Sequence, residues 1–236
     1  MAGEKYPDDS VQSWTGGWWV RDEKRIPVRG RLVRTFVPYP EQKPHRLIPE
    51  SRGSDPTDHK RAIVRIEPFR MGYPAAGGGL PVPALPLYPG ESYFIQRGKI
   101  RPALILSDTG TEVPKALRPS GDAAHQTAPT LLMAPYYGAD KDGTRAGWNP
   151  TLVDRIQHAE YPQYVWDRLP LAGAKESILR LDHIFPVSTD PACYELTDYR
   201  LSEEAASLMD EWLHWRITGR FPDKSILADI RTALLS

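Results

Sequence analysis

Proline constrains this chain most, because 24 of its 236 residues are proline and a further 18 are glycine. Proline usually makes up only about 5% of a protein. It has no backbone N–H and a fixed φ angle, so it interrupts helices and is confined to the edges and ends of strands. We therefore predict a mainly β protein with short strands, irregular connecting loops and few helices.

Residues 71–90 concentrate this composition, since half of them are proline or glycine and none is charged. Such a segment favours an extended, partly polyproline strap between two β segments. A docking peptide for another protein is the alternative. The three glycines at 77–79 do not form a phosphate-binding loop, because no Lys-Ser or Lys-Thr pair follows them.

Short apolar runs that end at proline or glycine indicate the strands. We expect residues 30–39 and 61–69 to form a hairpin around a long basic loop. Residues 92–107 are expected to form a second hairpin that turns near Gly98. Further strands are predicted at 129–138, 162–171 and 176–187.

Capping residues indicate three helices. Asn149 followed by Pro150 is a good cap and first-turn pair for a short helix. Ser202 and Gly219 bracket a longer helix at about 203–218, and residues 223–235 suit a third. The longer helix carries an apolar stripe made of Leu208, Met209, Trp212 and Leu213. We expect these helices to cover a β core, with a partner-binding groove as the alternative.

Charge is balanced in total but unevenly distributed. The 30 basic and 30 acidic residues cancel, which argues against a protein that coats polyanions. Residues 21–70 hold 13 Lys and Arg against 7 Asp and Glu, whereas residues 151–236 hold 9 against 14. One face could therefore attract phosphate while another repels it.

Cysteine content and hydropathy suggest a cytoplasmic protein. Cys193 is the single cysteine, so neither an intrachain disulfide nor a cysteine-based zinc site is expected. His125, His158 and His214 show no metal-ligand spacing, and no cofactor or metal is predicted. The start of the chain has no apolar signal-peptide core, and no segment approaches the ~20 apolar residues that span a bilayer. We expect no membrane association.

The order of four segments resembles the MazF/PemK-like toxins. They are "RGKIRPALILS" (97–107), "TLLMAP" (130–135), "PQYVWDRLP" (162–170) and "ESILRLDHIFPV" (176–187). The resemblance covers about residues 90–190. It implies a small, strongly bent antiparallel barrel of the MazF/PemK (CcdB-like) type.

The resemblance also implies a division of the chain. An N-terminal β elaboration of residues 1–90 would pack on a barrel core of residues 91–190. The C-terminal helices would occupy residues 191–236. The first ninety residues have no counterpart in compact members of the family.

The activity implied by the resemblance is metal-independent cleavage of single-stranded RNA by a toxin that an antitoxin protein restrains. A homodimer is implied as well. Cleavage requires activation of a ribose 2′-hydroxyl, stabilisation of charge on phosphorus and protonation of the leaving oxygen. A catalytically inactive member of the fold, which binds protein or nucleic acid, is the alternative function.

Arg101 and Pro102 stand where the family has its Arg-Pro pair. A guanidinium can bind phosphate oxygens in bidentate fashion, so Arg101 is the predicted catalytic arginine. Arg97 and Lys99 would help to hold the substrate at the mouth of the barrel. The alternative is that Arg101 only pairs with a carboxylate at the base of a hairpin.

Three positions depart from the family pattern. Tyr136, Tyr137 and Gly138 follow the "TLLMAP" strand where the family usually has Ser or Thr, so the hydroxyl is either absent or replaced by a phenol, and Tyr136 is the predicted catalytic phenol. His183 replaces a glutamine and could act as a general acid or base near neutral pH, or it could be structural. Gln96 lies at the approximate position of a family glutamate and is a predicted substrate-binding residue.

Three tryptophans lie beside a glycine pair in "WTGGWWV" (14–20). Their rings could stack on nucleobases. Packing of an N-terminal strand against the core, or contact with a partner, is the favoured alternative.

Overall fold

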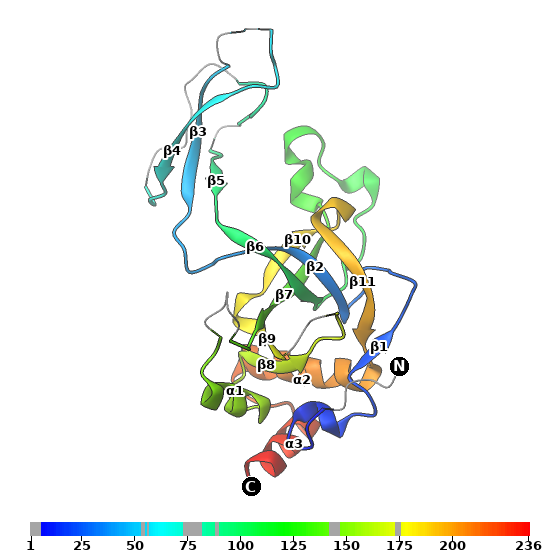
Figure 1. The fold of residues 1–236 in the computed structure, drawn as a ribbon. Helices are drawn as coiled ribbons and strands as arrows, with labels where there is room; N and C mark the ends of the chain where they lie inside the picture. The colour runs from blue at the N-terminus through cyan, green and yellow to red at the C-terminus, as the bar shows by residue number, and fades with distance from the viewer. Residues whose placement is uncertain are drawn as a thin grey trace. The chain divides into compact units, whose positions relative to one another are not determined.

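The computed structural model describes residues 6–52, 55, 57–72, 82–87, 90–141, 147–172 and 176–236, and these are mainly β (Figure 1). Its described strands are β1 (Trp19–Arg21), β2 (Arg31–Pro38), β3 (His45–Ser51), β4 (Ile63–Pro68), β5 (Tyr93–Ile95), β6 (Gly98–Ile105), β7 (Thr130–Gly138), β8 (Tyr164–Arg168), β9 (Glu176–Arg180), β10 (Phe185–Ser188) and β11 (Tyr194–Leu201). Its described α-helices are α1 (Pro150–Gln157), α2 (Glu203–Thr218) and α3 (Ile226–Leu235).

Contacts divide the chain into a main unit, residues 1–36 and 100–236, and an inserted unit, residues 37–99. These bounds differ from the expected segments 1–90, 91–190 and 191–236. The reason is that β2 and β6, which lead into and out of the inserted unit, are neighbours in one sheet. Most of the expected strap, residues 73–81 and 88–89, lies outside the described residues.

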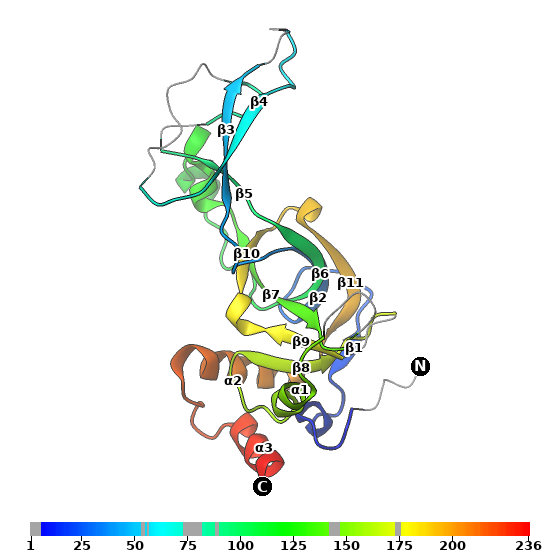
Figure 2. The ribbon, with the colours of Figure 1, turned by 60° about the vertical axis from the view of Figure 1, so that its left-hand side comes forward.

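The main unit is built on a curved sheet in the order β1-β11-β2-β6-β7-β9-β8, with β10 also paired to β7. The pairs β1–β11, β11–β2, β6–β7, β7–β9, β8–β9 and β7–β10 are antiparallel. Figure 2 shows the strands bending around a shared interior. The predicted mainly β, antiparallel fold with C-terminal helices is thus confirmed. In the described residues, however, the strand order ends at β1 and β8, so hydrogen bonds do not close it into a barrel.

Both predicted hairpins are wrong. Residues 30–39 and 61–69 do not pair, because β2 lies between β11 and β6 whereas β4 pairs with β3. The segment expected to be a basic loop contains β3, which forms a three-stranded sheet with β4 and β5 in the inserted unit. Residues 92–107 form no hairpin either, since β5 pairs with β3 and β6 with β7.

The strand predicted at 176–187 is interrupted. A 3-10 turn at Leu181–His183 separates β9 from β10. The Leu181 side chain is buried, and its backbone N–H donates to the carbonyl of Gln163 at 2.9 Å. This anchored turn redirects the chain, so His183 does not continue the alternation of β9.

The predicted helices are confirmed, together with their caps. The Asn149 side chain accepts hydrogen bonds at the start of α1, and Ser202 accepts one at the start of α2. Gly219 ends α2 with a φ of 74°, the left-handed conformation that favours glycine. The third helix begins at Ile226, three residues later than expected. Among the described residues, no helix has both the length and the apolar character needed to cross a membrane.

The core of the main unit joins the sheet to α2 and α3. Leu208, Met209 and Trp212 of the predicted stripe are buried in one cluster with sheet residues such as Leu104 and Leu179. Full burial of each large apolar side chain contributes about 1.5–3 kcal/mol. Covering the core is therefore the role of these helices in the main unit.

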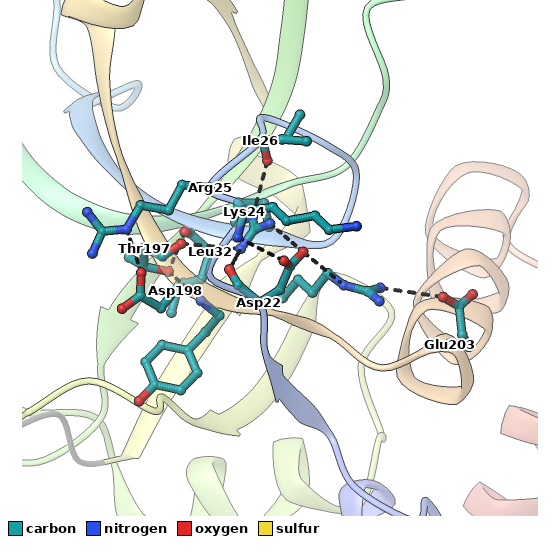
Figure 3. A network of polar contacts seen from close by, with 11 residues as sticks. Asp22, Lys24, Arg25, Ile26, Leu32, Thr197, Asp198 and Glu203 are labelled. Carbon is teal, nitrogen blue, oxygen red and sulfur yellow. Dashed lines mark hydrogen bonds and ion pairs between the residues drawn. The ribbon is translucent and has the colours of Figure 1, made fainter.

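A buried arginine connects the segment after β1 to the sheet, in the polar network that includes Asp22, Ile26 and Thr197 (Figure 3). Arg31 on β2 is fully buried, and its guanidinium donates to the carbonyl oxygens of Asp22 at 2.7 Å, Ile26 at 3.2 Å and Thr197 at 3.3 Å. It also donates to the Asp22 carboxylate at 2.7 Å. One side chain thus connects β2, β11 and the loop that follows β1.

Candidate functional site

Cationic and aromatic side chains gather on one face of four neighbouring strands, β6, β7, β9 and β8. Paired residues in a sheet point to the same side, as do residues two apart on a strand. Ala103 pairs with Pro135, Tyr137 with Ile178 and Tyr164 with Arg180. Arg101, Tyr137, Arg180 and Tyr164, one from each strand, therefore share a face.

Tyr137 is the centre of this group. The guanidinium carbon of Arg101 lies 4.2 Å from the centroid of the Tyr137 ring, within the range of a cation–π contact. On another side, the Tyr137 hydroxyl is 3.0 Å from Nδ1 of His183. The two rings meet edge to face with centroids 5.6 Å apart. The 3-10 turn after β9 brings His183 to this position.

Arg180 completes the group. It forms two hydrogen bonds to the Asp182 carboxylate, from Nε to Oδ1 at 2.7 Å and from Nη2 to Oδ2 at 2.6 Å. The same Nη2 lies 2.7 Å from Nε2 of His183. Burial alone would raise the pKa of Asp182, but hydrogen bonds and the charge of Arg180 hold it below its ordinary value. We call Arg101, Tyr137, Arg180, Asp182 and His183 the Tyr137 cluster.

Aromatic rings surround Arg180. Its guanidinium carbon lies 5.1 Å from the ring centroid of Tyr164, 5.7 Å from Tyr137 and 5.8 Å from Trp148. Trp148 and Tyr164 also meet edge to face at 5.5 Å. Trp148 directly precedes the Asn149 cap of α1, and its backbone N–H donates to the Ala139 carbonyl at 2.9 Å, so the helix start fixes its position.

Two of the three predicted catalytic residues meet in this cluster, namely Arg101 and His183. Tyr136 does not. It points to the opposite side of β7, is only 2% exposed and donates to Asp167 at 2.9 Å. Burial raises the pKa of the Tyr136 phenol well above its ordinary value. The phenol in the cluster comes from Tyr137, the next residue along the strand.

The predicted substrate-binding residues belong to the inserted unit, where all three are exposed. Gln96 donates from Nε2 to the Tyr39 carbonyl at 3.0 Å. The Arg97 carbonyl accepts from the Tyr39 N–H at 2.9 Å, and Lys99 is the second residue of β6. These two hydrogen bonds join Gln96 and the Arg97 backbone to Tyr39, so both residues help to stabilise the inserted unit.

A buried carboxylate was not predicted. Asp167 on β8 is completely buried and accepts four hydrogen bonds, from Tyr6 and Tyr136 at 2.9 Å and from the indoles of Trp18 and Trp19 at 3.2 Å. Burial raises the pKa of Asp167 to about 6, although the hydrogen bonds act in the opposite direction. We call these five residues the Asp167 cluster. The signal in the sequence was an acid inside the apolar strand "YVWDR".

The tryptophan motif thus has a structural role. Trp18 is buried and Trp19 is half-buried, and both donate to Asp167, so they fix the N-terminal strand to the core. This agrees with the favoured alternative for the motif. Trp14 is 55% exposed.

The described residues contain no group of three or more His, Cys, Asp or Glu side chains placed to hold a metal ion. Comparison of the chain with models of known protein families finds no match, and comparison with curated proteins finds none. The Tyr137 cluster combines a cation that can bind anionic oxygens, a phenol proton and an imidazole.

Proposed function

We propose that this protein is a MazF/PemK-like endoribonuclease that cuts single-stranded RNA without a metal ion, and that the Tyr137 cluster is its active site. The observation that carries the proposal is the contact of one phenol with a guanidinium and an imidazole, at 4.2 Å from Arg101 to the ring and 3.0 Å from His183 to the hydroxyl. The resemblance of residues 90–190 to that family supports it.

The proposed reaction forms a 2′,3′-cyclic phosphate. The ribose 2′-oxygen attacks phosphorus, its proton passes to water, and the bond from phosphorus to the 5′-oxygen breaks. Tyr137 donates its proton to the departing 5′-oxygen, and water later returns a proton to Tyr137. Arg101 and His183 stabilise the phenolate that exists in between, and Arg101 also attracts the phosphate. In this scheme Tyr137 takes the role first predicted for Tyr136.

The first experiment offers a mixed pool of single-stranded RNAs to the purified protein in EDTA. We expect cleavage and cyclic phosphate ends. Tyr137→Phe removes the hydroxyl that supplies the proton but keeps the ring, and it is expected to lower the rate about 10²- to 10⁴-fold. Arg101→Ala is expected to remove most activity as well. Tyr164→Phe is the matched control, because it removes a hydroxyl from the same sheet face and is expected to leave the rate unchanged.

Failure of the wild-type protein to cut any RNA in the pool would refute the proposed activity. RNA that is bound but not cut would support the second candidate function, a catalytically inactive binding module. The observation that favours this second function is the aromatic face itself. Trp148 and Tyr164 offer partly exposed rings beside Arg180, and aromatic rings beside arginines suit stacked bases.

The localisation, oligomeric state, partner protein and further substrate contacts of the protein are also part of the proposal. We propose a cytoplasmic homodimer, a partner antitoxin, and substrate contacts from Arg97, Lys99 and Gln96. Light scattering at micromolar concentration tests the dimer. Expression with and without the neighbouring reading frame tests the toxin and antitoxin pair, since a toxin is expected to slow growth only when expressed alone.

A further inference from the structure

Arg180 is held more firmly than a surface arginine usually is. Its side chain is 19% exposed and that of Asp182 is 23% exposed. Two parallel hydrogen bonds join the pair, and three aromatic rings lie within 6 Å of the guanidinium carbon. A bidentate pair of this kind fixes both the position and the plane of the guanidinium. The Nη2 group that faces His183 therefore has little freedom to turn away.

This geometry determines which nitrogen of His183 carries the proton. A guanidinium only donates hydrogen bonds, so at 2.7 Å from Nη2 the Nε2 atom of His183 must accept. A neutral imidazole carries one N–H, which must then be on Nδ1. Nδ1 is 3.0 Å from the Tyr137 hydroxyl, so the Tyr137 oxygen accepts that hydrogen bond. The hydroxyl's own proton then points away from His183.

We propose that Arg180 and Asp182 are positioning residues that keep His183 in the Nδ1–H tautomer and so direct the Tyr137 proton out of the cluster. For catalysis, this inference rests on the proposed ribonuclease function. Neither residue touches the reacting atoms in this scheme. Arg180 acts through His183, and Asp182 acts through Arg180. Without them, the Tyr137 hydroxyl can donate to Nδ1, and its proton is no longer directed toward the leaving oxygen.

Nitrogen NMR of the full-length protein tests the tautomer without any RNA. In 15N-labelled protein, at a pH where imidazoles are neutral, we expect Nδ1 of His183 to be protonated and Nε2 to be bare. Arg180→Met removes the donor but keeps an apolar chain among the rings. We expect the proton to move to Nε2. Arg180→Lys keeps one donor and is expected to retain the wild-type tautomer.

Arg155→Met is the matched control. Arg155 also pairs with a carboxylate, that of Glu160, and lies 5.1 Å from the centroid of an aromatic ring, that of Tyr161. It has no hydrogen bond to His183 among those seen in the structure, and its replacement is expected to leave the His183 signals unchanged. If Arg180→Met does not fold, Asp182→Asn loosens Arg180 instead, and we expect a mixture of both tautomers.

The outcomes separate this inference from the proposed function. A wild-type His183 protonated on Nε2, or an unchanged tautomer in Arg180→Met, overturns the inference whether or not RNA is cut. The expected tautomers in a protein that cuts no RNA support the assignment of the proton and refute the ribonuclease. If RNA is cut, we expect Arg180→Met to lower kcat roughly tenfold or more with KM unchanged, and Arg180→Lys to restore most of it.

Discussion

At the scale of single residues, Asp167 is a carboxyl group that is completely buried in the main unit. A carboxylate is costly to bury unless other groups donate hydrogen bonds to it or pair with its charge. Four donors surround it, two phenols and two indoles, and each favours the ionised form. Burial has the larger effect, since the pKa rises from 3.8 to about 6. The folded protein therefore binds a proton that the unfolded chain releases between about pH 4 and 6.

This raised pKa predicts a stability that falls with increasing pH. The contribution of Asp167 is fully present below the unfolded pKa of about 4 and is lost as the pH rises through about 6. The shift corresponds to about 3 kcal/mol in the free energy of unfolding. Urea titrations at a series of pH values measure it. Asp167→Asn is expected to remove this fall, and parallel curves for the two proteins between pH 4 and 7 would contradict the prediction.

Residue positions also set the limit of what the sequence could reveal about the site. Arg101 and His183 were predicted from motif position, and both lie in the cluster. Tyr137 was missed in favour of Tyr136 because adjacent residues of a strand face opposite sides. The residue types do not say which of two neighbouring tyrosines is buried. That depends on how β7 pairs with β9, a contact between distant parts of the chain.

At the scale of elements, β1 is a three-residue edge strand that pairs only with β11 in the described sheet. Its attachment depends on the segment that follows it, where Arg31 donates to Asp22 and Ile26. Removing a buried arginine leaves carbonyl and carboxylate oxygens without their donor, and such groups are costly when they are away from water.

We expect Arg31→Met to lower the free energy of unfolding by about 3 kcal/mol. Faster amide hydrogen exchange is expected in residues 19–26, because the loop loses its anchor to β2. Arg25→Met is the control. Arg25 is exposed and pairs with Asp198 at the surface, so its loss is expected to cost much less than the loss of Arg31. Equal effects of the two changes would show that burial of Arg31 contributes nothing.

The elements also differ in how well the sequence predicts them. Helix ends follow local rules, so Asn149, Ser202 and Gly219 were placed correctly from the chain alone. Strand pairing is not local. Residues 45–51 were expected to lie in the long basic loop between two paired strands, yet they form β3, the central strand of a sheet in which β4 and β5 are its partners.

At the scale of the whole molecule, the inserted unit leaves the main unit and returns to it at adjacent points. β2 and β6 are neighbours in the curved sheet, and the Tyr39 N–H donates to the Arg97 carbonyl at 2.9 Å. A tight turn could therefore join the two strands. Residues 40–96 are in this sense an elaborated hairpin connection.

We predict that the main unit folds without these residues. Replacing residues 40–96 with Asn-Gly, which favours a two-residue hairpin turn, is expected to give a chain that unfolds cooperatively. Near-ultraviolet circular dichroism is expected to retain the signal of the buried Trp18 and Trp212. The full-length protein under the same conditions is the reference. A shortened chain without this signal would show that the inserted unit is needed for folding.

The neighbouring ends of the inserted unit have an evolutionary consequence. Insertions, deletions and rapid sequence drift between Tyr39 and Arg97 leave the register of β2 and β6 as it is, because the distance to be bridged stays the same. The length of β7 is not free to vary in this way. One residue inserted before Tyr136 would place Tyr137 on the buried side of the strand and Tyr136 on the side of the cluster. Selection can thus reshape the proline-rich inserted unit while the strands that carry the Tyr137 cluster remain nearly fixed in length.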